Sequence, residues 1–173
     1  TVSPVNDAPV LSAIADTITL EEVPLGLLLT ATDVDDGDVL VYSASSDNEN
    51  VAAEVSGNLL TLTPALNFNG TANISVTVSD NGDPVASDIE TFVLTVSPVN
   101  DAPVLDPIGN QSTNEDTTLQ LTLSTTDVEN DSLTYTVSSD TIGVTVELDG
   151  AVLTLTPAAN WYGGDALITV TVD

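Results

Sequence analysis

An eleven-residue string, TVSPVNDAPVL, occurs twice without a change, at 1–11 and again at 95–105. The two copies are 94 residues apart, so the chain is built from a repeating unit of about this length. Repeats of roughly 20–50 residues are typical of solenoids, whereas a unit near 100 residues has the size of an independently folding β-sandwich domain. The duplication therefore predicts a modular array in which no single active site organises the chain.

The similarity continues beyond the identical string. The segment Leu60–Ala65, LTLTPA, returns as Leu153–Ala158, and the alternating strand Ile74–Val78 returns as Ile168–Val172. A one-residue deletion shifts the offset to 93 between these segments, and an extra glycine at Gly164 restores it to 94. The two copies are thus homologous along their whole shared length.

This homology predicts two domains, 1–98 and 99–173, with residues 1–4 as the tail of a preceding repeat. Two units of 94 residues would need 188 residues, and the chain has 173. The 15 residues of difference correspond to a stretch that includes most of the closing strand of the first domain, around 90–96. We therefore expect the second domain to lack that strand and the chain to be an excerpt from a longer array.

Apolar and polar residues alternate with the period of two that is typical of half-buried strands. Ile74, Val76 and Val78 form one such set, and Gly and Asn/Asp clusters separate it from the next. Strands are expected in the first repeat at 10–20, 25–32, 39–45, 51–55, 58–63, 72–79 and 89–97. Seven short strands in about 94 residues predict an all-β fold, with two tandem Greek-key β-sandwich domains of the immunoglobulin-like type.

The charge of the chain is entirely negative. It has 27 acidic residues and no lysine, arginine, histidine or cysteine, which gives a net charge of −27. Without cationic side chains it has nothing to neutralise a phosphate, so binding to nucleic acid or to an anionic membrane surface is disfavoured. No apolar run is long enough to enter a membrane. Divalent cations are the partners that this charge predicts, and a purely solubilising role for the acids is the alternative.

Catalysis is not expected. Activation of a serine or threonine nucleophile usually needs a histidine or lysine base, and the chain has neither. Zinc sites made of histidine and cysteine are excluded for the same reason. Carboxylate pairs could serve a glycosidase, but these acids lie in repeated loops with no sign of a cleft. We therefore predict a non-enzymatic protein.

One acidic loop has the composition of a calcium site. The segment 33–38, DVDDGD, places four carboxylates and a turn glycine in six residues. Strand alternation directs Asp33 and Asp35 to the same side, where their charges would repel unless a cation joined them. Calcium takes about six to eight oxygen ligands of this kind. The alternative for this loop is a solvated Asp/Gly turn, and for the linker Asn100-Asp101 it is an ordinary Asx turn.

Several of these elements together resemble cadherin-like repeats, of the kind found in bacterial surface adhesins and secreted modular proteins. The segment 31–37 with Tyr42-Ser43 resembles the cadherin A-x-D-x-D-x-G…Y-S element. The segments Asn6–Pro9 and Asn100–Pro103 resemble its N-D-N-x-P linker, and 78–84 is similar to its A-x-D-x-G-x-P loop. The resemblance covers the first repeat and the present part of the second.

The resemblance implies calcium ions held where consecutive domains meet. The ligands that it implies for the central junction are Glu21 or Glu22, Asn100, Asp101, Asp127 and Glu129. Those implied for the junction before the first repeat are Asp7, Asp33, Asp35 and Asp80. The chain departs from the cadherin pattern at 65–69, where ALNFN replaces the L-D-R-E element. Two strong carboxylate ligands are lost there, and 158–162 repeats the loss.

Trp161 and Tyr162 suggest a different function. They lie at a turn where an exposed aromatic ring could stack on a sugar, as in modules attached to polysaccharide-degrading enzymes. The structural alternative is that Trp161 plugs one end of the sandwich core, as Phe68 would in the first repeat.

The function predicted from the sequence is a structural spacer and adhesion segment, secreted or on a bacterial cell surface, with calcium-stiffened junctions between neighbouring repeats. A carbohydrate-binding module is the first alternative. The second is a filament subunit, in which a like chain fills the place of the missing strand by strand complementation.

Overall fold

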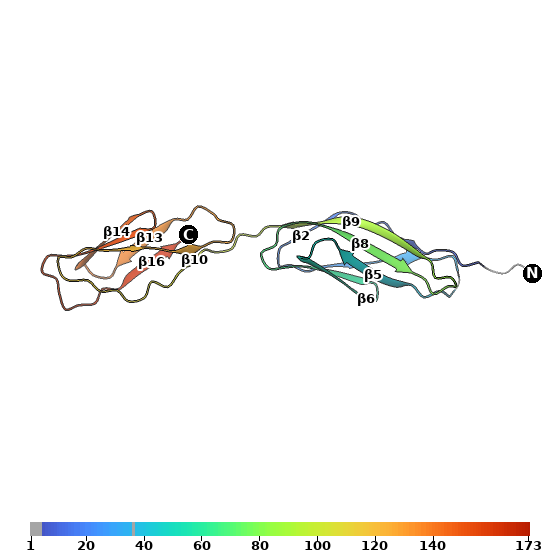
Figure 1. The fold of residues 1–173 in the computed structure, drawn as a ribbon, viewed down its shortest axis with the longest axis horizontal. Helices are drawn as coiled ribbons and strands as arrows, with labels where there is room; N and C mark the ends of the chain where they lie inside the picture. Colours follow the sequence, from blue (N-terminus) through green and yellow to red (C-terminus); the bar gives the residue numbers. More distant parts are fainter. Residues whose placement is uncertain (1–4, 36) are drawn as a thin grey trace, which may run out of the picture. The chain divides into compact units, whose positions relative to one another are not determined.

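The computed structural model describes residues 5–35 and 37–173. The tail expected at 1–4, and Asp36, lie outside the described residues. Every regular secondary-structure element in the described part is a β-strand, which confirms the all-β prediction. The chain forms two compact units, Thr1–Val99 and Asn100–Asp173, and each contains its own set of strands (Figure 1). No helix capable of spanning a membrane occurs in the part of the chain that the structure describes.

Unit 1 is a β-sandwich of two main sheets with an additional short strand pair. The larger sheet has the order β2-β9-β8-β5, with β2 parallel to β9 and the other pairs antiparallel. The smaller sheet has the order β3-β7-β6, and β1 pairs with β4. The strand bounds are β1 Val10–Leu11, β2 Thr17–Leu20, β3 Leu25–Leu28, β4 Ala31–Thr32, β5 Val41–Ser46, β6 Val51–Ser56, β7 Leu59–Pro64, β8 Gly70–Ser79 and β9 Ser87–Ser97.

The expected strand 10–20 is divided into β1 and β2, because its two ends pair with different partners. β1 is antiparallel to β4, whereas β2 runs parallel to β9. Between them, the carboxylate of Asp16 accepts a hydrogen bond from the backbone N–H of Val93 at 2.8 Å. This side chain takes the place of a backbone partner where the chain passes from one sheet to the other. The expected strand 25–32 is likewise divided into β3 and β4.

The core of unit 1 is formed by the inward faces of both sheets. Ile74, Val76 and Val78 of β8 are fully buried, as are Leu60 and Leu62 of β7. The adjacent strand β9 contributes three further buried side chains, Phe92, Leu94 and Val96. Full burial of one such side chain stabilises a fold by about 1.5–3 kcal/mol, so β9 is a major part of the hydrophobic core.

Unit 2 repeats this plan with fewer strands. Its sheets have the orders β11-β15-β14 and β13-β16, and β10 pairs with β12. The bounds are β10 Val104–Leu105, β11 Leu119–Thr122, β12 Thr125–Thr126, β13 Tyr135–Ser139, β14 Val144–Asp149, β15 Val152–Pro157 and β16 Ile168–Val172. Turn geometry is repeated as well: Glu22 and Asp116 both have a φ of 61°, and Asn67 and Asn160 have φ values of 56° and 54°.

The two units differ at the strand that closes the sandwich. In unit 1, β8 lies between β5 and β9, whereas β16, its counterpart, pairs only with β13 among the described residues. Ile168, Val170 and Val172 are consequently only half-buried, although their counterparts on β8 are fully buried. The residues described for unit 2 thus contain no counterpart of β9.

Candidate metal centre

The candidate centre lies at one end of unit 1 and is assembled by strand pairing. Because β1 and β4 are antiparallel, the residues before β1, Asn6 and Asp7, lie beside the loop that follows β4. The pair Val41↔Ser79 places the end of β8, and therefore Asp80, next to the start of β5. Three segments far apart in the sequence meet at this end of the sandwich.

The loop after β4 brings together three carboxylates, those of Asp33, Asp35 and Asp38. One oxygen from each lies within 4.8 Å of the others. Calcium–oxygen bonds are about 2.3–2.6 Å long, so two ligands of one ion are at most about 5 Å apart. The three oxygens are therefore close enough to bind one calcium ion together, with backbone carbonyls or water completing the shell.

Two oxygens of this cluster have no hydrogen-bond partner in the part of the chain that the structure describes. The Oδ2 atoms of Asp33 and Asp38 are buried and accept no hydrogen bond from the described residues. An ionised acceptor that is shielded from water and has no partner is destabilising. A cation is the partner that would satisfy both oxygens, since the chain contains no cationic side chain.

The electrostatics of the cluster are unfavourable without such a cation. Desolvation raises the pKa of the Asp38 carboxyl above its ordinary value, and the negative charges of Asp33, Asp35 and Asp80 raise it further. The shift means that the folded protein holds the ionised form of Asp38 less readily than water does. A bound divalent ion would reverse this effect.

Backbone N–H groups fix the orientation of the carboxylates. The N–H of Asp7 donates to Oδ2 of Asp35 at 2.8 Å, and the N–H of Asp35 donates to Oδ1 of Asp33 at 2.9 Å. Each of these two carboxylates therefore has one oxygen held by the backbone. This arrangement limits rotation of the side chains and keeps the cluster preformed.

Asp80 binds the segments that lie beside the Asp33 loop. It is 4% exposed; its Oδ1 accepts from the N–H groups of Ala86 and Gly82, and its Oδ2 accepts from the Asn6 amide at 2.8 Å. The bond from Ala86 is the main cause that lowers the Asp80 pKa, with further lowering by Asn6 and Gly82 against an opposing desolvation effect. Both oxygens are engaged, so Asp80 acts here as a scaffold for Asn6 and the loop 81–86.

Glu21 and Glu22, the early acidic residues, lie at the junction-side end of unit 1. Glu21 is 4% exposed. Its Oε1 accepts from the N–H of Val99 at 2.5 Å, and its Oε2 is buried with no hydrogen-bond partner among the described residues. Glu22 is exposed and occupies the left-handed turn at φ 61°. Glu21 thereby ties the end of β2 to the residues after β9.

Unit 2 repeats part of the metal-site geometry. The N–H of Asp101 donates to the Glu129 carboxylate at 3.2 Å, as Asp7 does to Asp35. Asp127, the counterpart of Asp33, accepts from the N–H of Asp131 at 2.8 Å. The amide of Asn100 donates to the carbonyl of Asp101 at 3.0 Å. Among the described residues, however, three acidic oxygens converge only in the Asp33, Asp35 and Asp38 cluster.

The family profile of the bacterial Ig domain matches the chain twice, over residues 6–95 and 100–173. The chain belongs to the bacterial Ig domain family. The matched ranges fall one in each of the two repeats. No curated protein matched in the sequence comparison.

Solved cadherin structures have the same fold as these Ig domains. Drosophila N-cadherin EC1-4 superposes with a TM-score of 0.57 at 14% identity, covering 96% of this chain and 49% of that one. Protocadherin Gamma C5 EC1-3 gives 0.51 at 19% identity, with coverages of 95% and 66%. Human CDH23 EC21-23 gives 0.51 at 25% identity, with coverages of 72% and 47%. The chain spans less than two thirds of each of these structures.

The two aromatic residues of the second Ig domain lie differently from each other. Tyr162 is 79% exposed. Trp161 is half-buried and lies directly over Gly143, where a Cβ atom would be 2.3 Å from its Nε1. Phe68 in the first Ig domain packs against the hydrophobic core. Sugar stacking by Trp161 and Tyr162 stays a prediction, and Trp161 has a structural contact of its own.

The structure brings together Asp33 and Asp35 of the predicted ligands and adds Asp38, which the sequence-based ligand set omits. Asp38 follows the glycine at which the cadherin A-x-D-x-D-x-G element ends, so the resemblance stopped one residue short of it. The signal that could have found it is the count of four carboxylates in the segment 33–38. Asp7 is exposed beside this cluster, and its backbone rather than its carboxylate makes the contact with Asp35.

Proposed function

We propose that this pair of bacterial Ig domains is a non-catalytic, calcium-binding spacer and adhesion segment of a secreted or cell-surface protein. The observation that carries the proposal is the convergence of Asp33, Asp35 and Asp38, with two buried oxygens that have no hydrogen-bond partner among the described residues. The membership of the family and the shared fold with cadherins support the structural role.

The mechanism is electrostatic. Without a cation, the three carboxylates repel one another, and the pKa of Asp38 is raised as a result of desolvation and this repulsion. With calcium bound, the same charges become ligands, and the fold is stabilised by mass action. A ligand at 100 times its Kd stabilises the folded state by about 2.7 kcal/mol. For a domain of this size, that corresponds to a rise in Tm of about 11–22 °C.

The proposal that consecutive repeats share calcium derives from the sequence. The calcium ligands proposed for the linker between the two domains are Asn100, Asp101, Asp127, Glu129 and the Glu21-Glu22 pair. Its test is a titration of the 173-residue chain that counts calcium ions. A single site would limit calcium to the Asp33 loop, and additional sites lost in the variant Asp127→Asn would extend it to the linker.

The main test compares melting curves of the full chain in calcium, in magnesium and in a chelator, at constant ionic strength. Asp35→Asn removes one ligand and should abolish the calcium-dependent rise in Tm of unit 1. Glu54→Gln is the matched control, because it removes the same charge from an exposed position on β6 outside the cluster. Coincident curves in calcium and chelator, or equal losses in both variants, would refute the proposal.

A further inference from the structure

The chain contains two Asn-Gly dipeptides, Asn69-Gly70 and Asn81-Gly82. In such a pair the backbone nitrogen of the glycine can attack the side-chain amide of the asparagine, because glycine has no Cβ to hinder the approach and the chain itself holds the two groups together. The surroundings of the two pairs differ. Gly70 is the first residue of β8 and pairs with Val96 of β9, whereas Asn81 and Gly82 lie in the loop that connects β8 to β9.

Both residues of the second dipeptide are needed by their contacts. Oδ1 of Asn81 accepts a hydrogen bond from the N–H of Val39 at 2.6 Å. A Cβ atom on Gly82 would lie 1.8 Å from Oδ1 of Asn6, so only glycine fits at this position while the Asn6 amide stays bonded to Asp80. The packing of this end of unit 1 therefore retains a chemically labile dipeptide.

The folded loop holds both of the groups that would react. The N–H of Gly82 donates to Oδ1 of Asp80 at 3.1 Å, and the bond from Val39 limits rotation of the Asn81 side chain. Negative charge develops on the glycine nitrogen during the attack, directly beside the Asp80 carboxylate. Repulsion between two unit charges at this separation slows the attack by about tenfold even at the dielectric constant of water.

We propose that Asn81-Gly82 is a latent modification site, which stays intact while this loop is ordered and is deamidated when the loop opens. In the open loop, the nitrogen of Gly82 gives its proton to hydroxide and bonds to Cγ of Asn81. The bond from Cγ to the amide nitrogen breaks, and that nitrogen takes a proton from water and leaves as ammonia. Water then opens the resulting succinimide ring, which gives aspartate or isoaspartate.

The isoaspartate product prevents the loop from closing as before. Its main chain passes through the side-chain carbon atoms, and the longer path moves Gly82 away from Asp80 and from Asn6. Either product also adds a negative charge beside Asp80, where the chain has no cationic side chain to balance it. The reaction is not reversed in water, so the modified fraction records how often this end of unit 1 has opened.

Timed incubation of the full 173-residue chain, folded in buffer and unfolded in urea, tests the proposal. Peptide mapping by mass spectrometry after cleavage at glutamate measures each site, and Asn69 is the internal reference. In urea the two dipeptides should react at similar rates. In the folded chain Asn81 should react at least about tenfold more slowly than in urea. Equal rates at Asn81 in the folded and unfolded chain would overturn the proposal.

A variant that opens the loop locally separates this mechanism from global unfolding. Asn6→Ala removes the amide that binds Asp80 and the Pro84 carbonyl and leaves both reacting residues in place. Deamidation of Asn81 in the folded variant should be severalfold faster than in the folded parent, with the rate at Asn69 unchanged.

Asn81→Gln is the matched control, because its longer side chain closes a five-membered ring no longer, and it should abolish modification at this position alone. An unchanged Asn81 rate in Asn6→Ala, or an equal acceleration at Asn69, would overturn the local control by the loop. All samples contain chelator, so the result does not depend on the proposed calcium binding.

Discussion

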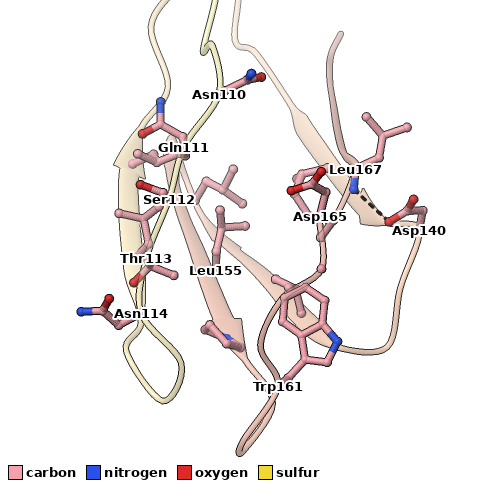
Figure 2. Close-up of a pocket in the computed structure, with 18 of the residues that line it drawn as sticks. Asn110, Gln111, Ser112, Thr113, Asn114, Asp140, Leu155, Trp161, Asp165 and Leu167 are labelled. Atoms are coloured by element: carbon pink, nitrogen blue, oxygen red, sulfur yellow. Dashed lines mark hydrogen bonds between the residues drawn. The ribbon is translucent and has the colours of Figure 1, made fainter.

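The two repeats contain an equivalent leucine, and the difference in its burial shows how much more of the core is accessible to solvent in unit 2 than in unit 1. Leu62 on β7 and Leu155 on β15 occupy equivalent positions in the LTLTP segment. Leu62 is 0% exposed, whereas Leu155 is half-buried and lines a groove in the surface of unit 2 (Figure 2). The same substitution, Leu→Ala, therefore has different consequences in the two units.

In unit 1, Leu62→Ala removes a side chain from a closed core. Both the lost transfer free energy and the cavity contribute, so the expected cost is about 2–5 kcal/mol. At about 3 kcal/mol the Tm of unit 1 falls by about 12–24 °C. In unit 2, Leu155→Ala enlarges a groove that water already reaches, so the cavity contribution is absent. Only part of the transfer free energy is lost, about 1 kcal/mol, which lowers the Tm of unit 2 by about 4–8 °C.

Calorimetry of the full chain, combined with Trp161 emission, separates the two transitions, because the single tryptophan lies in unit 2. The control repeats Leu155→Ala in a chain extended directly after Asp173, the counterpart of Ser79, by a copy of residues 80–97. There its cost should rise toward that of Leu62→Ala. Equal costs of the two substitutions in the unmodified chain would show that the groove is closed in solution, and the reasoning would fail.

Three further outcomes follow from the contacts in unit 1. Asp38→Asn should raise the Tm in chelator, because it removes a carboxylate whose ionised form the fold disfavours, as its raised pKa indicates. It should also remove the response of the Tm to calcium. A lower Tm in chelator would contradict this. Gly82→Ala should weaken calcium binding severalfold in a calorimetric titration, since its Cβ would lie 1.8 Å from Oδ1 of Asn6; unchanged affinity would show that the Asn6 contact is irrelevant. Hydrogen bonds from the Asn73 side chain and N–H lower the pKa of Asp47, so this carboxylate stabilises the fold above its unfolded pKa of about 3.9. That stability is lost as the pH falls through the lowered folded pKa. Asp47→Asn should therefore reduce Tm at neutral pH, with the two melting curves converging in acid; a constant difference would count against it.

The sandwich could be predicted from the sequence because it has two clear signals, the alternation of apolar residues along each strand and the duplication of the whole unit. Alternation along Ile74, Val76 and Val78 gives a buried face, and all three side chains are fully buried. The duplication then fixes the second domain by homology, including the absence of a closing strand in the segment present. Strand 10–20 could not be predicted correctly, because β1 and β2 differ only in which distant strand each one pairs with. Local alternation carries no information about that choice.

The sequence predicted that the candidate site is made of carboxylates, but it did not predict all of the residues that form it. Asp33 and Asp35 follow from alternation, since a spacing of two residues directs both to one side. Asp38 comes after a turn glycine with φ 98°, and the direction of the chain after such a turn is set by tertiary contacts. One of these is the bond from the N–H of Val39 to the Asn81 side chain at 2.6 Å, which connects segments 42 residues apart in the sequence.

The acidity of the chain and the geometry of the Asp33 loop lead to the same requirement. With 27 acids and no cationic side chain, every charge must be balanced by solvent ions, and most of the acids are exposed enough for this to cost little. Asp33 and Asp38, like Glu21, differ because each has a buried oxygen that accepts no hydrogen bond from the described residues. Diffuse counterions cannot satisfy a buried oxygen, whereas a directly bound ion can. Under the proposed function, the stability of unit 1 should therefore depend on the concentration of a cation that binds directly at this loop.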